Sequence, residues 1–575
     1  MVLLPLLFYA QVALALVNWP QLSPRLTTVT RSQRDIAEEI PIDQLSTFGL
    51  SLNTLVFDKK GYTTDALDEL PAMLAVGVQT FMLDLYWNEV TSKWQLCPAP
   101  FPGNATMDIA PKDLFWNGHN YTCGVLLTLG LINAWINTYI AGTNSNMDAN
   151  YLQLLLNLKS IKFPQNSSQI YVPRSAEFAS LGNSTLSDSV ASLGSYIFTP
   201  RDLASFRNSA VPRTGSGAYY NRSDTRMPPL SIFLLNDFRR VLINVVSSDL
   251  DESSSSSYNI STQDRDTLFF DSTLPTVIDT ADDNLYSSCL DMINGSDLTS
   301  SYSNVSLNTH FRFLMDGDDD LFTNETYMNY IRCGHSVILN SSEYVFEKQD
   351  YNSSQNHSVG AIWDYLLPSS YWSWAIGQPI SGVNNTVLTN FTDDQPDTSD
   401  RELRAHCVAL NPEGFVLSNC YDPFHYACQN ESDPTDWNIP RDLKRRYFDA
   451  YKPGNCPDGY RFTLPRLSIE LLALKARVVD DELPFPVWID LNDITVSNCF
   501  VSGGPYAQCP YQQTVTRSQL VLMIAPSFVV AVVIIILIFM EKILRVTPIH
   551  TNRRRHWKHI INEYNEKHEY EGVPS

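Results

Sequence analysis

The chain has 575 residues, which is long enough for two or three domains. Apolar residues make up 44% of it and aromatic residues 11%, a composition that excludes an intrinsically disordered protein. The formal net charge of −22 resides before the basic C-terminus, so most of the surface would repel nucleic acid and direct contact with it is not expected.

The N-terminal residues 1–17 form an apolar run that is too short to span a bilayer. We interpret this run as a signal peptide, with Ala13 and Ala15 as the small residues of a cleavage site. An uncleaved anchor or a buried strand is the alternative. Residues 18–45 are polar and are expected to form an extended leader.

Residues 46–310 alternate short β-rich runs with helical stretches, an order that predicts a parallel α/β sheet or barrel. Between the first two runs, Thr64 can cap a helix that Pro71 should kink or divide. The expected strands are residues 49–58, 78–85, 240–246 and 276–279.

The segment ALDELPAMLAVGVQTFMLDLYW, residues 66–87, resembles the first βα unit of phospholipase-C-like TIM barrels that act on phosphatidylinositol. This resemblance implies a TIM-barrel-like fold with a general-base histidine at the end of the first strand and Glu-x-Asp on the second. In this chain Asn53 and Thr54 occupy the first position, and Met82 and Asp84 occupy the second.

Histidine is scarce in the expected barrel, where only His119 and His310 occur and neither is near these strands in sequence. Without a paired acid and base, attack on a phosphodiester lacks its proton transfers. We therefore expect a catalytically silent barrel with no cofactor. Carboxylates such as Asp84 and Glu89 leave acid–base hydrolysis open as an alternative.

All ten cysteines lie from Cys97 to Cys509, which predicts disulfides rather than a metal site. Residues 311–335 are interpreted as a connection, and residues 336–510 as a separate cysteine-rich region. The acidic run at residues 316–320 lacks the glycine and glutamate spacing of an EF-hand, so a solvated loop is expected there.

The cysteine-rich region contains two segments that are similar to halves of a C-type lectin-like domain. The pattern of the second half comes first and comprises WSWAIGQP at residues 372–379 followed by Cys407, Cys420 and Cys428. The resemblance implies a Cys407–Cys420 disulfide and a more distant partner for Cys428. Residues 456–462 and 487–493 resemble the first half. The halves either build one permuted domain or belong to two degenerate modules.

The sugar-binding motifs of calcium-dependent lectins are incomplete here. Gln378-Pro379 continues with Ile380, residues 415–419 replace the Trp-Asn-Asp motif, and a separate Gln-Pro-Asp lies at residues 395–397. Calcium needs six or more oxygen ligands, and the motifs do not supply them. A lectin-like fold that contacts protein is therefore expected, with glycan binding as the alternative.

Residues 520–540 contain no charged side chain. The segment also has the length that a transmembrane helix needs. After Glu541, basic residues dominate the start of a tail, residues 541–575, that has seven basic and five acidic side chains. This asymmetry predicts a cytosolic C-terminus and hence a single-pass type I membrane protein. The expected location is the secretory pathway, the vacuole or the cell surface.

Fifteen Asn-x-Ser/Thr sequons lie on the side of this span that is expected to be lumenal. Their density predicts a glycoprotein with a glycan-coated surface. The asparagines are Asn104, Asn120, Asn166, Asn183, Asn221, Asn259, Asn294, Asn304, Asn324, Asn340, Asn352, Asn356, Asn384, Asn390 and Asn430.

Four segments together resemble the fungal maintenance of telomere capping protein 6 family: LNTLVFDKKGYTTDAL, GVQTFMLDLYWNEVTSKWQLCPAPFP, YWSWAIGQP and HCVAL. The family name implies a role in telomere capping, and the expected topology makes that role indirect. We expect a non-catalytic ectodomain that binds a protein or glycan, or acts as a scaffold. A lumenal phosphodiesterase or glycan-processing hydrolase is the alternative.

Overall fold

The computed structural model describes residues 22–89, 91–100, 110–161, 183–208, 227–250, 257–270, 276–280, 283–294, 310–344, 370–379, 406–511 and 517–567. The chain divides into two compact units, Met1–Cys509 and Pro510–Ser575. The expected signal peptide, residues 1–17, lies outside the described residues.

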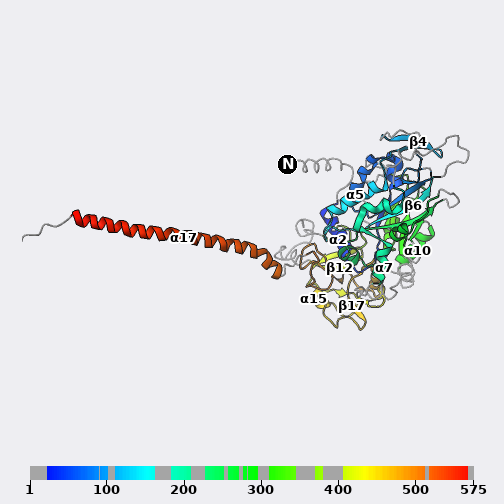
Figure 1. Ribbon diagram of the computed structural model, residues 1–575. Helices are drawn as coiled ribbons and strands as arrows, with labels where there is room; N and C mark the ends of the chain where they lie inside the picture. The colour runs from blue at the N-terminus through cyan, green and yellow to red at the C-terminus, as the bar shows by residue number, and fades with distance from the viewer. Residues whose placement is uncertain are drawn as a thin grey trace, which may run out of the picture. The chain divides into compact units, whose positions relative to one another are not determined.

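The first unit contains a nine-stranded sheet whose main strands run parallel and follow one another in chain order (Figure 1). These strands are β1 (Phe48–Ser51), β2 (Thr80–Asn88), β6 (Leu152–Ser160), β8 (Val241–Asp249), β9 (Thr276–Thr280), β10 (His310–Met315) and β11 (Ser336–Leu339). The last strand, β11, pairs in parallel with β1. Strand β9 contacts β8, but no backbone pairing joins them within the described ranges. The expected TIM-barrel-like fold is thus confirmed as a curled sheet with one open seam.

Two short strands complete this sheet: β7 (Ile197–Phe198) pairs in parallel with β8, and β3 (Lys93–Gln95) pairs antiparallel with β2. A separate hairpin consists of β4 (Lys112–Trp116) and β5 (His119–Cys123). Helices connect the main strands, as in other βα folds. They are η2 (Asn53–Phe57), α3 (Asp58–Lys60), η3 (Thr64–Glu69), α4 (Leu70–Ala75), α5 (Leu129–Gly142), α6 (Leu186–Val190), η4 (Ala191–Tyr196), α7 (Pro200–Asn208), η6 (Ile232–Asn236), α9 (Thr262–Leu268), α10 (Asp283–Ile293) and α12 (Asn324–Arg332).

Alternation along the strands separates the two faces of the sheet. Phe81, Leu83 and Leu154 share a core with helix residues such as Met73 and Ile136, so they face outward. The opposite, inward face carries aligned layers. One layer contains Ser51, Met82, Leu155 and Asn244, and the next contains Asp84, Asn157 and Ser247.

Two sequence-based boundaries in the barrel are wrong. The expected connection, residues 311–335, contains most of β10 and all of α12, and β11 lies inside the expected cysteine-rich region. The barrel needs these elements because β11 pairs with both β1 and β10, which would otherwise be exposed edges. The first expected strand, residues 49–58, ends at Ser51, and helical turns follow.

The two lectin-like segments share their sheets, so they are not separate modules. Strand β12 (Cys407–Asn411) pairs with β18 (Val487–Asn492), and β15 (Cys428–Asn430) pairs with β17 (Tyr460–Phe462). The other elements are β13 (Gly414–Ser418), β14 (His425–Tyr426), β16 (Trp437–Asn438), α15 (Tyr447–Ala450) and α16 (Ser468–Asp480).

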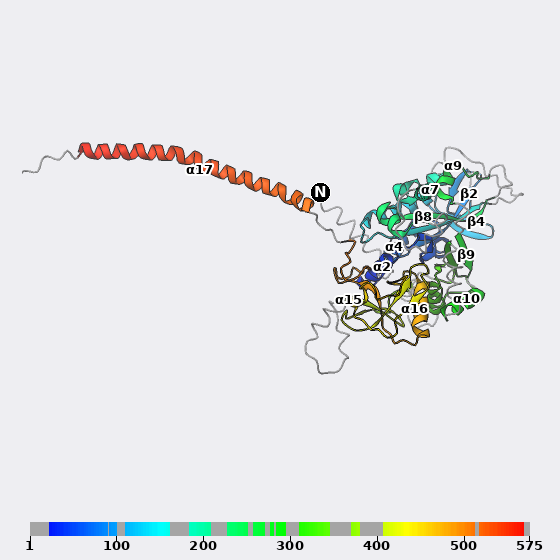
Figure 2. The ribbon, with the colours of Figure 1, turned by 90° about the horizontal axis from the view of Figure 1, so that it is seen from below.

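The expected extended leader is instead largely helical. Helix α2 (Pro24–Ile36) begins at the N-cap Ser23, whose side chain accepts a hydrogen bond from the Leu26 amide. Its Val29 and Ile36 are buried in the core of the cysteine-rich region. Ser32 accepts a hydrogen bond from the Trp374 indole at 3.2 Å. Figures 1 and 2 show this helix between the barrel and the cysteine-rich strands. A short helix, η1 (Ile42–Gln44), leads from it to β1.

In the second unit, the structure describes the long helix α17 (Arg517–Lys567). Its segment Ala525–Lys542 is long and apolar enough to cross a membrane. The helix continues to Lys567, through most of the expected tail.

Candidate functional site

Polar side chains gather at the carboxyl ends of the parallel strands, the end at which TIM-barrel proteins place their functional groups. We call this group the barrel mouth. It comprises Asn53, Asp84, Tyr86, Asn157, Lys159, Ser247, Asp316 and Asn340, which lie on or directly after β1, β2, β6, β8, β10 and β11.

Asp84, a residue that the sequence singled out, is the centre of the barrel mouth. One carboxylate oxygen accepts a hydrogen bond from the Asn157 amide at 3.0 Å, and the other lies 2.7 Å from the Lys159 ammonium. The Tyr86 hydroxyl donates to that second oxygen at 3.3 Å. Asp84 faces Asn157 directly in the register, and Tyr86 faces Lys159. The negative charge of Asp84 is therefore balanced by Lys159, and both carboxylate oxygens have partners within the protein.

Asn53 occupies the position where the phospholipase resemblance implies a histidine. Its side-chain oxygen accepts a hydrogen bond from the Asp84 backbone amide at 2.8 Å, and its amide donates to the Tyr62 hydroxyl at 3.4 Å. Asn53 thus joins the helical turn after β1 to β2. An amide has no basic nitrogen, so this side chain positions its neighbours and cannot take a proton from a substrate.

A second carboxylate, Asp58, lies beside this group and accepts a hydrogen bond from the Tyr62 hydroxyl at 2.7 Å. The loss of hydration at this carboxyl raises its pKa. The Tyr62 hydrogen bond opposes that effect, and the like charge of Asp84 adds to it. Burial and the Asp58 charge also raise the pKa of Tyr62, which holds its proton.

One inward-facing amide lies below Asp84 with an unused donor. Asn244 aligns with Leu155 in the layer under Asp84, and its side-chain nitrogen is buried without a hydrogen-bond partner in the described structure. Buried amide donors are nearly always satisfied by protein or by water. The Asn244 nitrogen can therefore donate a hydrogen bond to a bound water or to an acceptor group of a ligand.

The other histidine and carboxylate candidates lie elsewhere. His119 is exposed on β5, and its charge opposes in part the burial that raises the pKa of Asp58. His310 begins β10, at the opposite end of the sheet, and contacts Asp43. Glu89 is half-buried in the turn after β2. No cluster of three potential metal ligands occurs among the described residues.

The acidic run at residues 316–320 is only partly the solvated loop that we expected. Asp316 is buried and accepts hydrogen bonds from the Asn340 and Ser341 amides and from the Tyr344 hydroxyl. Burial raises the pKa of Asp316 to about 6, against the effect of these donors. The exposed Asp318 bonds the hydroxyls of Ser341 and Ser342. The run thus fixes the chain that follows β11.

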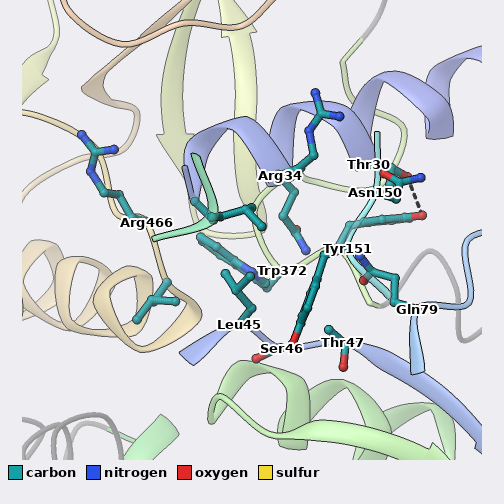
Figure 3. Close-up of a pocket in the computed structure, with 15 residues that line it drawn as sticks. Thr30, Arg34, Leu45, Ser46, Thr47, Gln79, Asn150, Tyr151, Trp372 and Arg466 are labelled. Atoms are coloured by element: carbon teal, nitrogen blue, oxygen red, sulfur yellow. Dashed lines mark hydrogen bonds between the residues drawn. The ribbon is translucent and has the colours of Figure 1, made fainter. Parts of the chain in front are cut away.

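A small cavity of about 70 Å³ lies at the amino ends of the strands (Figure 3). Its walls come from three parts of the chain: Thr47 and Tyr151 of the barrel, Arg34 of α2, and Trp372 and Arg466 of the cysteine-rich region. In TIM barrels this face usually serves stability. We interpret the cavity as part of the seam between the barrel and the cysteine-rich region.

The cysteine-rich region confirms the pairing implied for its cysteines. Cys407 bonds Cys420, and Cys428 bonds the more distant Cys456. The other disulfides are Cys97–Cys123, Cys289–Cys333 and Cys499–Cys509, so all ten cysteines are paired.

The lectin-type polar residues of this region are used internally. The Gln378 side chain accepts a hydrogen bond from the Leu417 amide at 3.4 Å. Asp490 on β18 is buried and accepts hydrogen bonds from the amides of Gly503 and Gly504 and from the Tyr447 hydroxyl. The Gln-Pro-Asp triplet at residues 395–397 lies outside the described residues. A polar pocket of about 730 Å³ lies next to Asp490.

Seven of the fifteen sequon asparagines fall within the described ranges, and none of the seven is buried. They are Asn120, Asn183, Asn259, Asn294, Asn324, Asn340 and Asn430. Asn340 is half-buried at the barrel mouth, where its side-chain oxygen accepts a hydrogen bond from Thr54 at 3.0 Å. The eight others, Asn104, Asn166, Asn221, Asn304, Asn352, Asn356, Asn384 and Asn390, lie outside these ranges.

Comparison with known proteins gives consistent relatives over nearly the whole chain. A family profile described as "MTC6 partial TIM-barrel domain" matches residues 20–359. "Maintenance of telomere capping protein 6" of Debaryomyces hansenii is 44% identical, over 97% of this chain and 96% of the relative. The protein of the same name from Candida tropicalis is 41% identical, over 97% and 96%. The one from Yarrowia lipolytica is 26% identical, over 97% and 92%.

Among solved structures, a calcium-dependent phosphoinositol-specific phospholipase C from Pseudomonas sp is 13% identical. The similarity covers 53% of this chain and 91% of that chain with a TM-score of 0.25, which is too low to support an argument.

Proposed function

Because this chain belongs to the maintenance of telomere capping protein 6 family, we propose that it supports telomere capping indirectly, as a single-pass type I membrane glycoprotein. Its lumenal ectodomain is a non-catalytic scaffold that binds a protein or a glycan. The C-terminus is cytosolic, and the ectodomain lies across the membrane from DNA.

The state of Asp84 is the observation that carries the non-catalytic proposal. An acid–base catalyst must exchange a proton with its substrate, so its carboxyl group has to be available at the reacting bond. Asp84 is instead held by Asn157, Lys159 and Tyr86, and Asn53 stands where the resemblance implies a base. These contacts favour a structural role for the barrel mouth.

Three features support the membrane and lumenal parts of the proposal. The apolar segment of α17 has the length of a span, and basic residues follow it. All ten cysteines are paired, and disulfides form and persist mainly in the secretory pathway and outside the cell. The seven described sequons are accessible in whole or in part.

We further propose that the cysteine-rich region is one permuted C-type lectin-like domain. The antiparallel pairing of β15 with β17 joins the end of the second half to the start of the first. The Cys428–Cys456 disulfide joins the same two segments. Probing a glycan array with the full chain, with and without calcium, tests whether this domain binds sugar. Calcium-dependent binding would identify a glycan as the ligand, and the absence of binding would favour a protein.

A hydrolase is the second candidate function, because the raised pKa of Asp58 beside Asp84 resembles the separation of roles in acid–base carboxyl pairs. Assays of the full chain on phosphodiesters and glycosides distinguish the two candidates. Asp84→Asn is the matched variant, since it removes one carboxylate and keeps its shape. We expect no turnover above that variant, and turnover that depends on Asp84 would contradict the scaffold proposal.

A further inference from the structure

The β4–β5 hairpin is a two-residue hairpin at the edge of the first unit (Figure 1). Asn117 and Gly118 form its turn, with φ angles of 49° and 87°. Two consecutive residues with positive φ are typical of a type I′ turn, which Asn-Gly favours. The Cys97–Cys123 disulfide anchors the end of β5.

The two faces of this hairpin differ in environment. Leu114, Trp116 and Tyr121 are partly buried and pack against the barrel core. The outer face is exposed and carries Asp113, Phe115, Asn120 and Thr122. Phe115 is 71% exposed and is the apolar residue of that face. The ring is therefore available to an apolar partner on this face, and covering it would remove apolar surface from water.

The register puts Phe115 directly opposite Asn120. Trp116 and His119 flank the turn and form the hydrogen-bonded pair that closes it, so the next pair is a non-hydrogen-bonded one. Side chains of such pairs lie closest together, with Cα atoms about 4.5 Å apart. Asn120 begins the sequon Asn-Tyr-Thr, and its Thr122 hydroxyl donates to Asp113 at 2.6 Å on the same face.

We propose that Asn120 carries an N-glycan whose first N-acetylglucosamine packs on the Phe115 ring, an inference that rests on the proposed secretory glycoprotein. The Asn120 Nδ2 forms a bond to C1 of the sugar, and the C1–O bond to a lipid-linked pyrophosphate donor breaks. The bond electrons leave with the pyrophosphate, and Nδ2 loses one proton and keeps one. The C–H face of the sugar then covers the exposed ring, which removes apolar surface of both from water.

Hydrogen exchange of the hairpin amides in the full-length glycosylated protein tests this contact. Phe115→Ala and Asn120→Gln should each raise exchange by up to about fivefold, the effect of one cross-strand pair. The double variant should exchange no faster than either single variant, because both remove the same contact. Trimming every glycan to its first sugar should leave the wild-type rate unchanged. Tyr506→Ala, at a residue 88% exposed, is the aromatic control and should have no effect.

Site-resolved mass spectrometry of the same samples distinguishes failure of the Phe115–glycan contact from failure of the glycoprotein proposal. Glycan at other sequons but none at Asn120 would overturn the contact and leave the glycoprotein proposal intact. Absence of glycan at every sequon would overturn both. An occupied Asn120 with additive effects of the two substitutions would overturn the contact alone. The anchoring disulfide keeps the hairpin attached in all variants, so exchange remains measurable.

Discussion

Glu38 follows α2, and its backbone oxygen accepts a hydrogen bond from the Ser231 amide. Burial raises the pKa of Glu38 from 4.5 to about 7. That value already includes the charges of Asp35 and Glu39, which raise the pKa, and those of Arg34 and Arg466, which lower it. Replacing Glu38 with glutamine keeps the size of the side chain and removes the charge that this site disfavours.

The sign of the effect follows from linkage between protonation and folding. Below pH 4.5 both the folded and the unfolded states hold the proton, so ionisation of Glu38 does not lower the free energy of unfolding. As the pH rises from 4.5 to 7, the unfolded state releases the proton first, and ionisation therefore favours unfolding. The gap from 4.5 to about 7 corresponds to about 3 kcal/mol at most, since one pKa unit is worth 1.36 kcal/mol.

Urea unfolding at pH 4.5, 6 and 8 measures this difference. Glu38→Gln should match the wild type at pH 4.5 and exceed its free energy of unfolding by up to about 3 kcal/mol at pH 8. Glu39→Gln is the matched control. Glu39 is 41% exposed and pairs with Arg466 at 3.2 Å, so its loss should cost up to about 1 kcal/mol. A Glu38→Gln protein that loses stability with pH in parallel with the wild type would refute the reasoning.

Three further predictions concern the barrel mouth, a disulfide and a sequon. Lys159→Met should lower stability by about 1 kcal/mol, because Lys159 is 39% exposed, and Asp84→Asn in the same chain should recover part of that loss in a double-mutant cycle. Replacing Cys428 and Cys456 with serine removes a disulfide between residues 28 positions apart in sequence. This should lower the free energy of unfolding, measured with urea, by about 3–4 kcal/mol. Asn340, half-buried at the barrel mouth with its side-chain oxygen bonded to Thr54, should show lower occupancy in glycopeptide mapping than the exposed Asn120, Asn259, Asn294 and Asn324. High occupancy there would mean that the mouth opens before modification.

Local sequence signals predicted the elements that are marked by a pattern of apolar residues or by a proline. The strand expected at residues 78–85 is β2, and Pro71 divides the first helix between η3 and α4. Strand β18 lies within residues 487–493, one of the two segments that resemble the first half of a lectin-like domain. Each of these signals lies within a dozen neighbouring residues.

The missed elements depend on partners far away in the chain. Ser23 and Pro24 are helix-start signals that could have indicated α2, but its burial depends on Trp374. Strand β11 is too short to recognise alone, and its place is set by pairing with β1. The same holds for the site. The sequence identified Asp84, but its neutralisation by Lys159 appears only when β2 and β6 are aligned.

The central claim is that the whole first unit lies on the lumenal or extracellular side of a membrane. A protease-protection experiment on intact membranes, with a tag after Ser575 and endoglycosidase digestion of the protected fragment, measures this directly. The account predicts that protease removes the tag and leaves a protected ectodomain that shrinks on endoglycosidase treatment. A protected tag, or an ectodomain that is digested and carries no glycan, would contradict it.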